Sequence, residues 1–449
     1  MTPQSNFMVA APILPGREAE LRQLLLTMNK CPGTVDPANA LVPFGQFGTL
    51  HFARFVILDD VTLGDLAAYG VTFPDPPVYL AFLGDCDGSA DRLLADFAFR
   101  AEPGLRKIFS YCKGFQPNED LLAWMRSHSV KPATAYVNWI GRTVRQIREE
   151  AELHEALSIY LAGLPKELLD ESPQQIRAEL IRKVQEKGPR VSPPAPTPLL
   201  WQIKRLAQIS VAVAALIGFV LPLLVLPLLA AFFLYALFFF VLLAALGVFL
   251  YRLRQHETTD PEILTPPTSD QLTALGAIQD FDVTNQYSAF GAIKPGPFRR
   301  RTMTFLLWVI NLATPFLYPR GNLARVKTIH FARWVFLDDK RRVVFASNYD
   351  GSSESYMDDF VNKVAFGLNL TFSHGVSYPK TSFLIFGGAS REQEFKNTQR
   401  RHSLPTEVWY KAYPGLTLMD ISRNARVRKG LEEQKPMSDG EIRQWLSEI

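Results

Sequence analysis

The longest apolar stretch of the chain covers residues 206–251, and it contains no Asp, Glu, Lys or Arg over 46 residues. A helix of that length would be about 69 Å long at 1.5 Å per residue, whereas one crossing of the hydrocarbon core needs about 20 residues. Pro222 and Pro227 lie near its middle, and each removes an amide donor and disfavours helix. The pattern therefore predicts a transmembrane hairpin of two helical arms.

This stretch has two other interpretations. A hairpin buried in a large soluble domain would be apolar on one face only, whereas residues 232–240 are apolar all round. A re-entrant or monotopic hairpin fits the first arm, whose strongly apolar part is short and covers residues 209–221. Basic residues flank both ends, namely Lys204 and Arg205 before the stretch and Arg252 and Arg254 after it. Flanking positive charge favours the cytoplasmic side, so we expect both soluble parts of the chain there.

On either side of the hairpin, the apolar pattern predicts the same order of elements: strand, helix, strand, strand, helix, strand. The first strand and helix cover residues 7–13 and 17–29 in the first half, and 287–293 and 299–312 in the second. The fourth strand is expected at 134–139 in the first half, and at either 381–386 or 408–412 in the second. This order is the split βαβ, or ferredoxin-like, pattern.

The two halves also match in sequence. Residues 49–60 (TLHFARFVILDD) correspond to residues 328–339 (TIHFARWVFLDD), and residues 84–89 correspond to 347–352. The offsets between partners form a collinear series, which indicates an internal duplication: 280 at Gly16/Gly296, 279 at His51/His330, 263 at Asp87/Asp350 and 274 at Gly141/Gly415.

These patterns predict an α+β protein in which two ferredoxin-like modules pack their bare sheet faces together as an intramolecular α+β barrel pair. Modules that pack together share one compartment, so the chain between them crosses the membrane an even number of times. The predicted division is a first module at 1–141, a helical and Pro-rich connector at 142–205, the hairpin at 206–251, a linker at 252–284, a second module at 285–431 and a tail helix at 432–449.

Composition adds little to this picture. The net charge of +4 over 449 residues gives no indication of nucleic-acid binding. The three cysteines, Cys31, Cys86 and Cys112, predict no disulfide framework and fit a reducing compartment. The first residues lack a basic region followed by an apolar core, so no cleavable signal peptide is expected. The hairpin is then the element that targets the chain to a membrane.

The candidate chemistry lies in the second and third strands of each half. If Leu337 faces Val343 across a tight hairpin, His330 faces Asp350. Directly opposed side chains have Cβ atoms about 4.5–5.5 Å apart, and a carboxylate beside an imidazole orients it and raises its basicity. We therefore expect a His–Asp pair in the second half.

The same pairing puts Arg333 opposite Ser347, and the repeat predicts that His51 lies near Asp87 in the first half. Arg54 and Arg333 project from the other face of their strands, because side chains alternate. Two roles remain open for the His–Asp pairs. They either handle protons or orient a metal inside a barrel cavity, or they are buried hydrogen-bonded pairs whose Asp caps the next helix.

The duplicated pattern resembles the dimeric α+β barrel superfamily, which includes dye-decolourising peroxidases, chlorite dismutase and cofactor-free monooxygenases. Residues 84–88 (GDCDG) are similar to the Gly-x-x-Asp-Gly motif of the dye-decolourising peroxidases. The resemblance implies that Asp87 assists peroxide cleavage above a haem, with an Arg nearby and a His on the iron. Ser347 departs from this motif in the second half. His374, whose counterpart is Tyr111, is a candidate haem or metal ligand.

Two functions follow from these patterns. One is an oxidoreductase, peroxidase-like or monooxygenase-like, that acts on an apolar substrate from the bilayer, with haem as a candidate cofactor. Its expected catalytic residues are His330, Asp350, Arg333, His51, Asp87 and Arg54. The alternative is a non-catalytic membrane adaptor or lipid-binding protein that uses the barrel cleft. In both cases the expected partners are the lipid bilayer and an apolar small molecule or lipid, and the sequence predicts no oligomeric state.

Overall fold

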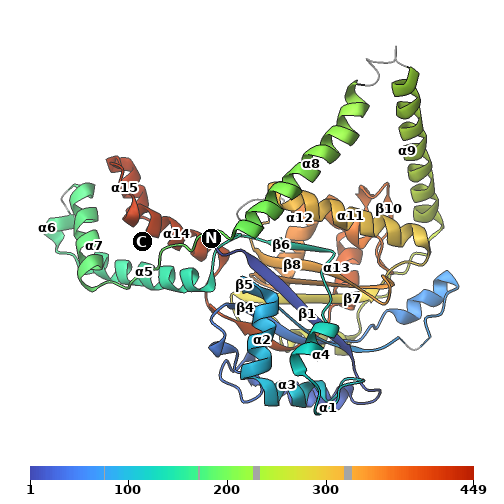
Figure 1. Ribbon diagram of the computed structural model, residues 1–449, viewed down its shortest axis with the longest axis horizontal. Helices are drawn as coiled ribbons and strands as arrows, with labels where there is room; N and C mark the ends of the chain where they lie inside the picture. Colours follow the sequence, from blue (N-terminus) through green and yellow to red (C-terminus); the bar gives the residue numbers. More distant parts are fainter. Residues whose placement is uncertain (75, 170–171, 226–232, 318–325) are drawn as a thin grey trace.

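The computed structural model describes the chain from residue 1 to 449, apart from residues 75, 170–171, 226–232 and 318–325 (Figure 1). The protein is a mixed α+β structure whose main strands form two four-stranded antiparallel sheets. Helices cover the outer face of each sheet, and two long helices extend away from the second sheet (Figure 1).

The first sheet has the order β1-β5-β4-β12. Its strands are β1 (Gln4–Pro12), β5 (Tyr79–Asp87), β4 (Leu50–Leu58) and β12 (Thr406–Lys411), and every neighbouring pair is antiparallel. All nine residues of β4 are buried, because a central strand covered on both faces is apolar almost throughout.

The second sheet has the order β6-β8-β9-β7. Its strands are β6 (Thr134–Val137), β8 (Ile329–Leu337), β9 (Arg342–Asp350) and β7 (Thr284–Ala292), again antiparallel. Strand β6 comes from the first half of the chain, whereas β12 in the first sheet comes from the second half. Each sheet is therefore completed by a strand that belongs to the other half.

The two expectations for the fourth strand have clear outcomes. The strand predicted at 134–139 is confirmed as β6, and of the two alternatives in the second half, the one at 408–412 is confirmed as β12. Residues 381–386 contribute instead to the small β10–β11 ribbon. Burial explains the difference, because the side chains of β12 lie in the core whereas Phe383, Ile385 and Phe386 are exposed.

The two sheets pack face to face, with helices on both outer faces (Figure 1). Met8, Val56 and Leu83 from the first sheet contact Val335 and Val344 from the second. The outer layers consist of α1 (Glu18–Leu26), α2 (Ala90–Arg100), α3 (Glu102–Phe109) and α4 (Leu121–Ser127) on the first sheet, and α11 (Pro297–Leu317), α12 (Ser353–Phe372) and α13 (Glu392–His402) on the second.

A separate group of helices forms an arm beside the sheets (Figure 1). It contains α5 (Val144–Ala162), α6 (Lys166–Leu169), α7 (Pro173–Lys187), α14 (Leu418–Glu432) and α15 (Asp439–Leu446). The arm has its own apolar core, to which Leu157, Leu180, Val427 and Trp445 contribute. The remaining elements are α10 (Ser269–Gly276), the short strands β2 (Asn29–Cys31), β3 (Thr34–Val35), β10 (Thr381–Ser382) and β11 (Phe386–Gly387), and the 3₁₀ turns Phe44–Gln46, Leu63–Tyr69 and Gly388–Ser390.

The two long helices are α8 (Leu199–Val225) and α9 (Phe233–Thr259). Among the described residues, one helical segment, Leu237–Thr259, is long and apolar enough to cross a membrane, and very little of it is buried. Helix α8 continues past Pro222 to Val225. The predicted turn at Pro227 lies outside the described residues.

The pairing predicted for the β8–β9 hairpin is wrong by one residue. Leu337 faces Arg342, not Val343. The turn residues 338–340 all have left-handed backbone angles, with φ between 51° and 63°. The loop between the paired residues has four residues, 338–341, one fewer than the predicted pairing left, so the register shifts along the hairpin.

The same shift places Arg333 opposite Ala346, not Ser347. A β-bulge at His330 then changes the register again, and it brings the imidazole to Asp350. A bulge inserts one extra residue and re-aims the side chain at that point. The contact between His330 and Asp350 is therefore confirmed, although the pairing from which it was predicted is incorrect.

Strand β12, which the second half of the chain contributes to the first sheet, carries a buried carboxyl group. Glu407 accepts a hydrogen bond from the Ile57 amide at 3.0 Å and has the Arg22 guanidinium at 3.5 Å. Burial dominates, and it raises the pKa of Glu407 from 4.5 to about 7. A carboxyl whose pKa is higher in the folded protein than in the unfolded chain adds stability below the unfolded pKa, and this stability is lost as the pH rises through the folded pKa.

We expect the Glu407→Gln variant to be more stable than the wild type by about 3 kcal/mol above about pH 8, since one pKa unit corresponds to about 1.4 kcal/mol. The difference should shrink as the pH falls toward the unfolded pKa. Thermal unfolding of the purified protein across this range measures it. The exposed Glu155→Gln variant is the control, and equal melting temperatures for Glu407→Gln and wild type at alkaline pH would contradict the prediction.

Candidate functional site

The first His–Asp pair lies where β5 ends and α5 begins. Asp87 Oδ1 lies 2.9 Å from His51 Nε2, and Asp87 Oδ2 accepts a hydrogen bond from the Val144 amide at 2.9 Å. The other imidazole nitrogen, Nδ1, lies 3.0 Å from the Tyr413 hydroxyl. Val144 is the first residue of α5, so the carboxylate holds the imidazole and caps a helix at the same time.

The second pair has the same arrangement at the start of α14. Asp350 Oδ1 lies 2.6 Å from His330 Nε2 and accepts a hydrogen bond from Thr284 Oγ1 at 3.1 Å. Asp350 Oδ2 accepts one from the amide of Leu418, the first residue of α14, at 2.7 Å. All four oxygens of the two carboxylates therefore have partners inside the protein.

This geometry favours the structural interpretation of the pairs, but the expectation that each Asp caps the next helix is wrong. The carboxylates contact the starts of α5 and α14, whereas Ser89 and Ser352 cap the next helices, α2 and α12. A carboxylate at a helix N-terminus satisfies an amide that has no partner within the helix and interacts favourably with the helix dipole. The space beside both imidazoles has a volume of about 20 Å³, which is enough for about one water molecule. A substrate molecule does not fit there. The catalytic role of these residues stays a prediction that the geometry does not support.

Packing and turn geometry account for the GDCDG sequence as well. A Cβ atom on Gly84 would lie 2.4 Å from the Phe52 carbonyl oxygen and 2.8 Å from the Phe7 ring, so no larger residue fits. Gly88 has a φ of +76°, which favours glycine. Ser89 caps α2 through the Arg92 amide. The motif thus serves the fold at this position.

Arg54 reaches from the first sheet into the second. Its Nη1 donates to the Tyr287 carbonyl and the Ser288 hydroxyl, both at 2.9 Å. Its Nη2 donates to the Ser347 carbonyl at 2.9 Å and to Asn348 Oδ1. The side chain also lies over the Trp409 ring, 5.0 Å from the centroid.

Arg333 makes the reciprocal contacts from the second sheet. Its Nη1 donates to the Phe7 and Gly84 carbonyls, both at 2.9 Å, and its Nη2 pairs with Asp85. Asn348 Nδ2 donates to Asp85 Oδ2 at 3.1 Å, so one hydrogen-bonded chain links the two arginines. The prediction that both project from the other face of their strands agrees with these contacts.

This network joins two guanidinium groups to a single carboxylate. Burial, and then the charge of Arg333, lower the pKa of Arg54 to about 9. Burial raises the pKa of Asp85, and both arginines act against that rise. Sequence reasoning missed Asp85 and Asn348. The available signal was the repeat itself, because Asp85 and Asn348 occupy equivalent positions. Their residue numbers differ by 263, as those of Asp87 and Asp350 do.

His374 is buried and has no exposed edge. Burial and the positive charges of Arg299 and Lys294 hold the pKa of its imidazole well below the ordinary value. Among the described residues, no hydrogen bond of ordinary geometry reaches either ring nitrogen, although the nearby Leu370 backbone acts to raise the pKa. The side chain lines none of the described cavities. It is enclosed by the core and by two cations.

The residues present do not fit the haem site that the resemblance implies. Both oxygens of Asp87 are engaged, and His374 does not face a cavity. Within the described ranges, no group of three or more His, Cys, Asp or Glu side chains could hold a metal ion. We therefore derive no step through haem or a metal.

The structure has a large apolar cavity elsewhere. It lies between α11, α12 and the second sheet and has a volume of about 420 Å³, which is within the usual range of small-molecule sites. Sequence reasoning did not find it. Its walls are formed mainly by apolar side chains, among them Tyr136, Ile310, Ala313, Trp334, Phe360 and Phe366.

Two features of α12 shape this cavity. The helix is kinked at Val364, where φ is −135° and ψ is 17°, and Val364 lines the wall. Lys363 is the charged residue of the lining, and its ammonium group pairs with Asp359 at 2.6 Å. A lysine that pairs at its tip lines a wall with its aliphatic stem, so the interior stays apolar.

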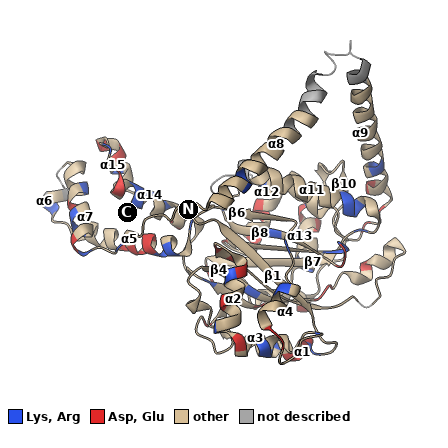
Figure 2. Ribbon diagram, in the orientation of Figure 1, with Lys and Arg blue, Asp and Glu red and all other residues tan. Residues whose placement is uncertain are grey.

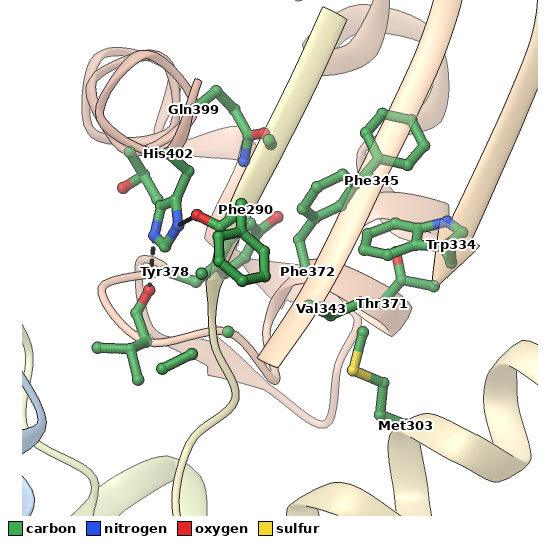
Figure 3. A pocket seen from close by; sticks show the side chains of 16 residues that line it. Phe290, Met303, Trp334, Val343, Phe345, Thr371, Phe372, Tyr378, Gln399 and His402 are labelled. Atoms are coloured by element: carbon green, nitrogen blue, oxygen red, sulfur yellow. Dashed lines mark hydrogen bonds between the residues drawn. The ribbon is translucent and has the colours of Figure 1, made fainter. Parts of the chain in front are cut away.

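A smaller pocket of about 40 Å³ adjoins the cavity (Figure 3). Trp334, Phe345 and Phe372 line both spaces. At the far side of the small pocket, His402 lies 3.2 Å from the Phe290 carbonyl oxygen and 3.0 Å from the Val376 carbonyl oxygen, and Figure 3 draws both contacts.

If the His–Asp pairs are structural, removing a carboxylate lowers stability. Asp350→Ala leaves the Leu418 amide and the imidazole without their acceptor, at an expected cost of about 3 kcal/mol. Asp350→Asn should cost less, because its amide oxygen still accepts from Leu418. The exposed Asp59→Ala variant is the control. Thermal unfolding measures the loss, and an Asp350→Ala protein as stable as the control would rule out the structural role.

Comparisons with protein-family models, with curated proteins and with solved structures found no match.

Proposed function

We propose that the protein is a membrane-anchored lipid-binding protein that accommodates an apolar chain in the cavity between α11, α12 and the second sheet. The observation that carries this proposal is the cavity itself, about 420 Å³ in volume and lined mainly by apolar side chains. Burying apolar surface contributes about 25 cal/mol per Å², so a hydrocarbon chain gains free energy by leaving water for such a site.

The position of the cavity supports a bilayer origin for the ligand. Helix α11, which forms one wall, packs against α8. Both α8 and α9 leave the globular part close to this wall (Figure 1). A chain could pass from the bilayer into the cavity over a short distance and without exposure to water. The binding site in this proposal is on the helical side of the second sheet, not in a cleft between the sheets, because the inter-sheet face is filled by packed side chains.

In this proposal α8 and α9 form the two arms of the anchor, and both halves of the chain lie on the cytoplasmic side. The apolar segment Leu237–Thr259 supports the anchoring. The exchange of β6 and β12 between the sheets supports the shared side, because sheets built from both halves require one compartment. Figure 2 shows Lys and Arg near the base of the two helices and little charge beyond it, as expected for a positively charged cytoplasmic end.

The scaffold in this proposal is a pair of duplicated ferredoxin-like modules that form an intramolecular α+β barrel pair. The matching orders β1-β5-β4-β12 and β7-β9-β8-β6 support it, as each element has its repeat partner at the same place. The equivalent contacts of the two His–Asp pairs are further support. An oxidoreductase is the alternative function that the sequence predicts. Among the described residues, no cavity of substrate size lies at the His–Asp pairs.

A variant that fills the cavity tests the proposal. Ala313 lines the cavity from α11, whereas Asn311 on the same helix is exposed. We expect Ala313→Trp to bind a pyrene-labelled fatty acid at least roughly tenfold more weakly than the wild type, equivalent to about 1.4 kcal/mol. Asn311→Trp, which adds the same side chain outside the cavity, should bind normally.

Fluorescence titration of the purified protein in lipid nanodiscs measures the affinity, and a melting curve checks that Ala313→Trp is folded. Saturable binding to the wild type that is lost only in Ala313→Trp supports the proposal. Absence of saturable binding to the wild type, or equal affinities for the two tryptophan variants, would contradict it.

A further inference from the structure

The end of α9 is fixed to the second half of the chain by a buried carboxylate. Glu257 accepts hydrogen bonds from the Thr381 hydroxyl at 2.8 Å, the Phe383 amide at 2.7 Å and the Leu384 amide at 2.9 Å. These three donors lie in residues 381–387, the small hairpin that β10 and β11 form, which we call the β10–β11 loop. A buried carboxylate with three hydrogen bonds is a rigid connection, so the loop has a fixed position relative to the apolar helix.

The N-terminus of α11 is attached to the same end of α9. Arg299 pairs with Asp260 at 2.6 Å, and the buried Lys294 lies 3.8 Å from the same carboxylate. The rings of Phe298 and Phe249 lie 5.7 Å apart. Phe249 lies two residues before the charge-free stretch ends at Tyr251, so the start of α11 lies beside the end of that stretch.

Large apolar side chains are exposed on these elements and on α12, which packs against α11. We call them the apolar collar, and they are Phe305 and Trp308 of α11, Phe366 of α12, and Phe383, Ile385 and Phe386 of the β10–β11 loop; their exposed fractions lie between 42% and 68%. Single exposed apolar residues are ordinary on a soluble protein, whereas several gathered around one feature indicate an interaction surface.

The opposite helical layer provides an internal comparison. On α1 to α4, which cover the first sheet, Leu26 and Phe99 are the exposed large apolar residues among those described. Figure 1 places that layer on the far side of the molecule from α8 and α9. Of the two helical layers, the one from which the two long helices emerge therefore exposes more large apolar side chains.

Basic side chains border the collar. Arg300, Arg301 and Lys340 line an open pocket of about 490 Å³ together with Phe305 and Trp308, and Asp339 is its one carboxylate. Tryptophan is enriched at the headgroup level of membranes, and Lys and Arg near the surface attract anionic lipids. The pocket combines both features within one short stretch of α11 and the adjacent turn.

We propose that the apolar collar rests on the bilayer surface, and that Arg300, Arg301 and Lys340 bind the phosphate groups of anionic phospholipids there. The second half is thereby held against the membrane, and the first half faces away from it. This inference rests on the membrane anchoring in the proposed function, but not on the occupancy of the cavity. Because Phe366 belongs to both the collar and the cavity wall, the cavity opens at the membrane surface.

The test uses the full chain reconstituted in vesicles, with an environment-sensitive NBD dye on one cysteine at a time. Cys31, which is exposed, is replaced by serine, whereas Cys86 and Cys112 are buried and are retained. The dye is placed at Phe305→Cys in the collar, at Phe99→Cys on the opposite layer, and at Leu246→Cys in the apolar segment of α9. The vesicles contain phosphatidylcholine with or without phosphatidylglycerol.

We expect a blue-shifted emission, increased severalfold in intensity, from the dyes at Leu246→Cys and Phe305→Cys, and an aqueous spectrum from the dye at Phe99→Cys. With phosphatidylglycerol present, the Phe305→Cys signal should increase further, and either Arg300→Gln with Arg301→Gln or added salt should remove that increase. These substitutions lie outside the cavity lining.

The outcomes separate the two proposals. A dye at Leu246→Cys that reports water overturns the anchoring and this inference together. If the dye at Leu246→Cys reports lipid and the dye at Phe305→Cys reports water, this inference alone is overturned. A Phe305→Cys signal that is equal in both kinds of vesicle overturns the binding of anionic headgroups.

Discussion

The reciprocal insertion of two arginines between the sheets is the interaction on which the rest of the structure depends. Arg54 and Arg333 each leave their own sheet and donate to backbone carbonyls of the other. Burying two guanidinium groups carries a large desolvation cost, which the full set of hydrogen bonds and Asp85 offset. Such a network tolerates little sliding of one sheet over the other, and the exchanged strands β6 and β12 prevent the halves from separating without unfolding.

This interlocking constrains the membrane arrangement. Both ends of the segment formed by α8 and α9 return to a single globular body, and buried ion pairs and hydrogen bonds fix α9 to α11 and the β10–β11 loop. The two halves share their strand order and their His–Asp pairs, but differ in their outer layers. The layer next to the long helices contains a large apolar cavity and several exposed aromatic residues, whereas Phe99 is the exposed aromatic residue described on the other layer. The difference between the layers, not the shared framework, indicates where the function lies.

Three features could be predicted from the sequence: the repeating order of elements, the contact of each histidine with its aspartate, and the strand at 134–139. They follow from local pattern and from comparison of the halves. The register of the β8–β9 hairpin was missed, since three consecutive left-handed residues in the turn have no clear sequence signal without glycine. The cavity could not be predicted, because it depends on the kink at Val364 and on the volumes of side chains from five elements. The partnership of Asp85 with Asn348 required the distance between the sheets.

The central claim is that one interlocked body, built from both halves, lies on one side of the bilayer. Cys31 in the first half is exposed, and Ser355 in the second half is an exposed position for an introduced cysteine. In sealed vesicles that contain the protein in one orientation, a membrane-impermeant maleimide should label Cys31 and Ser355→Cys to the same extent, before and after permeabilisation. Labelling of one site only, with the other becoming accessible after the membrane is opened, would contradict the account.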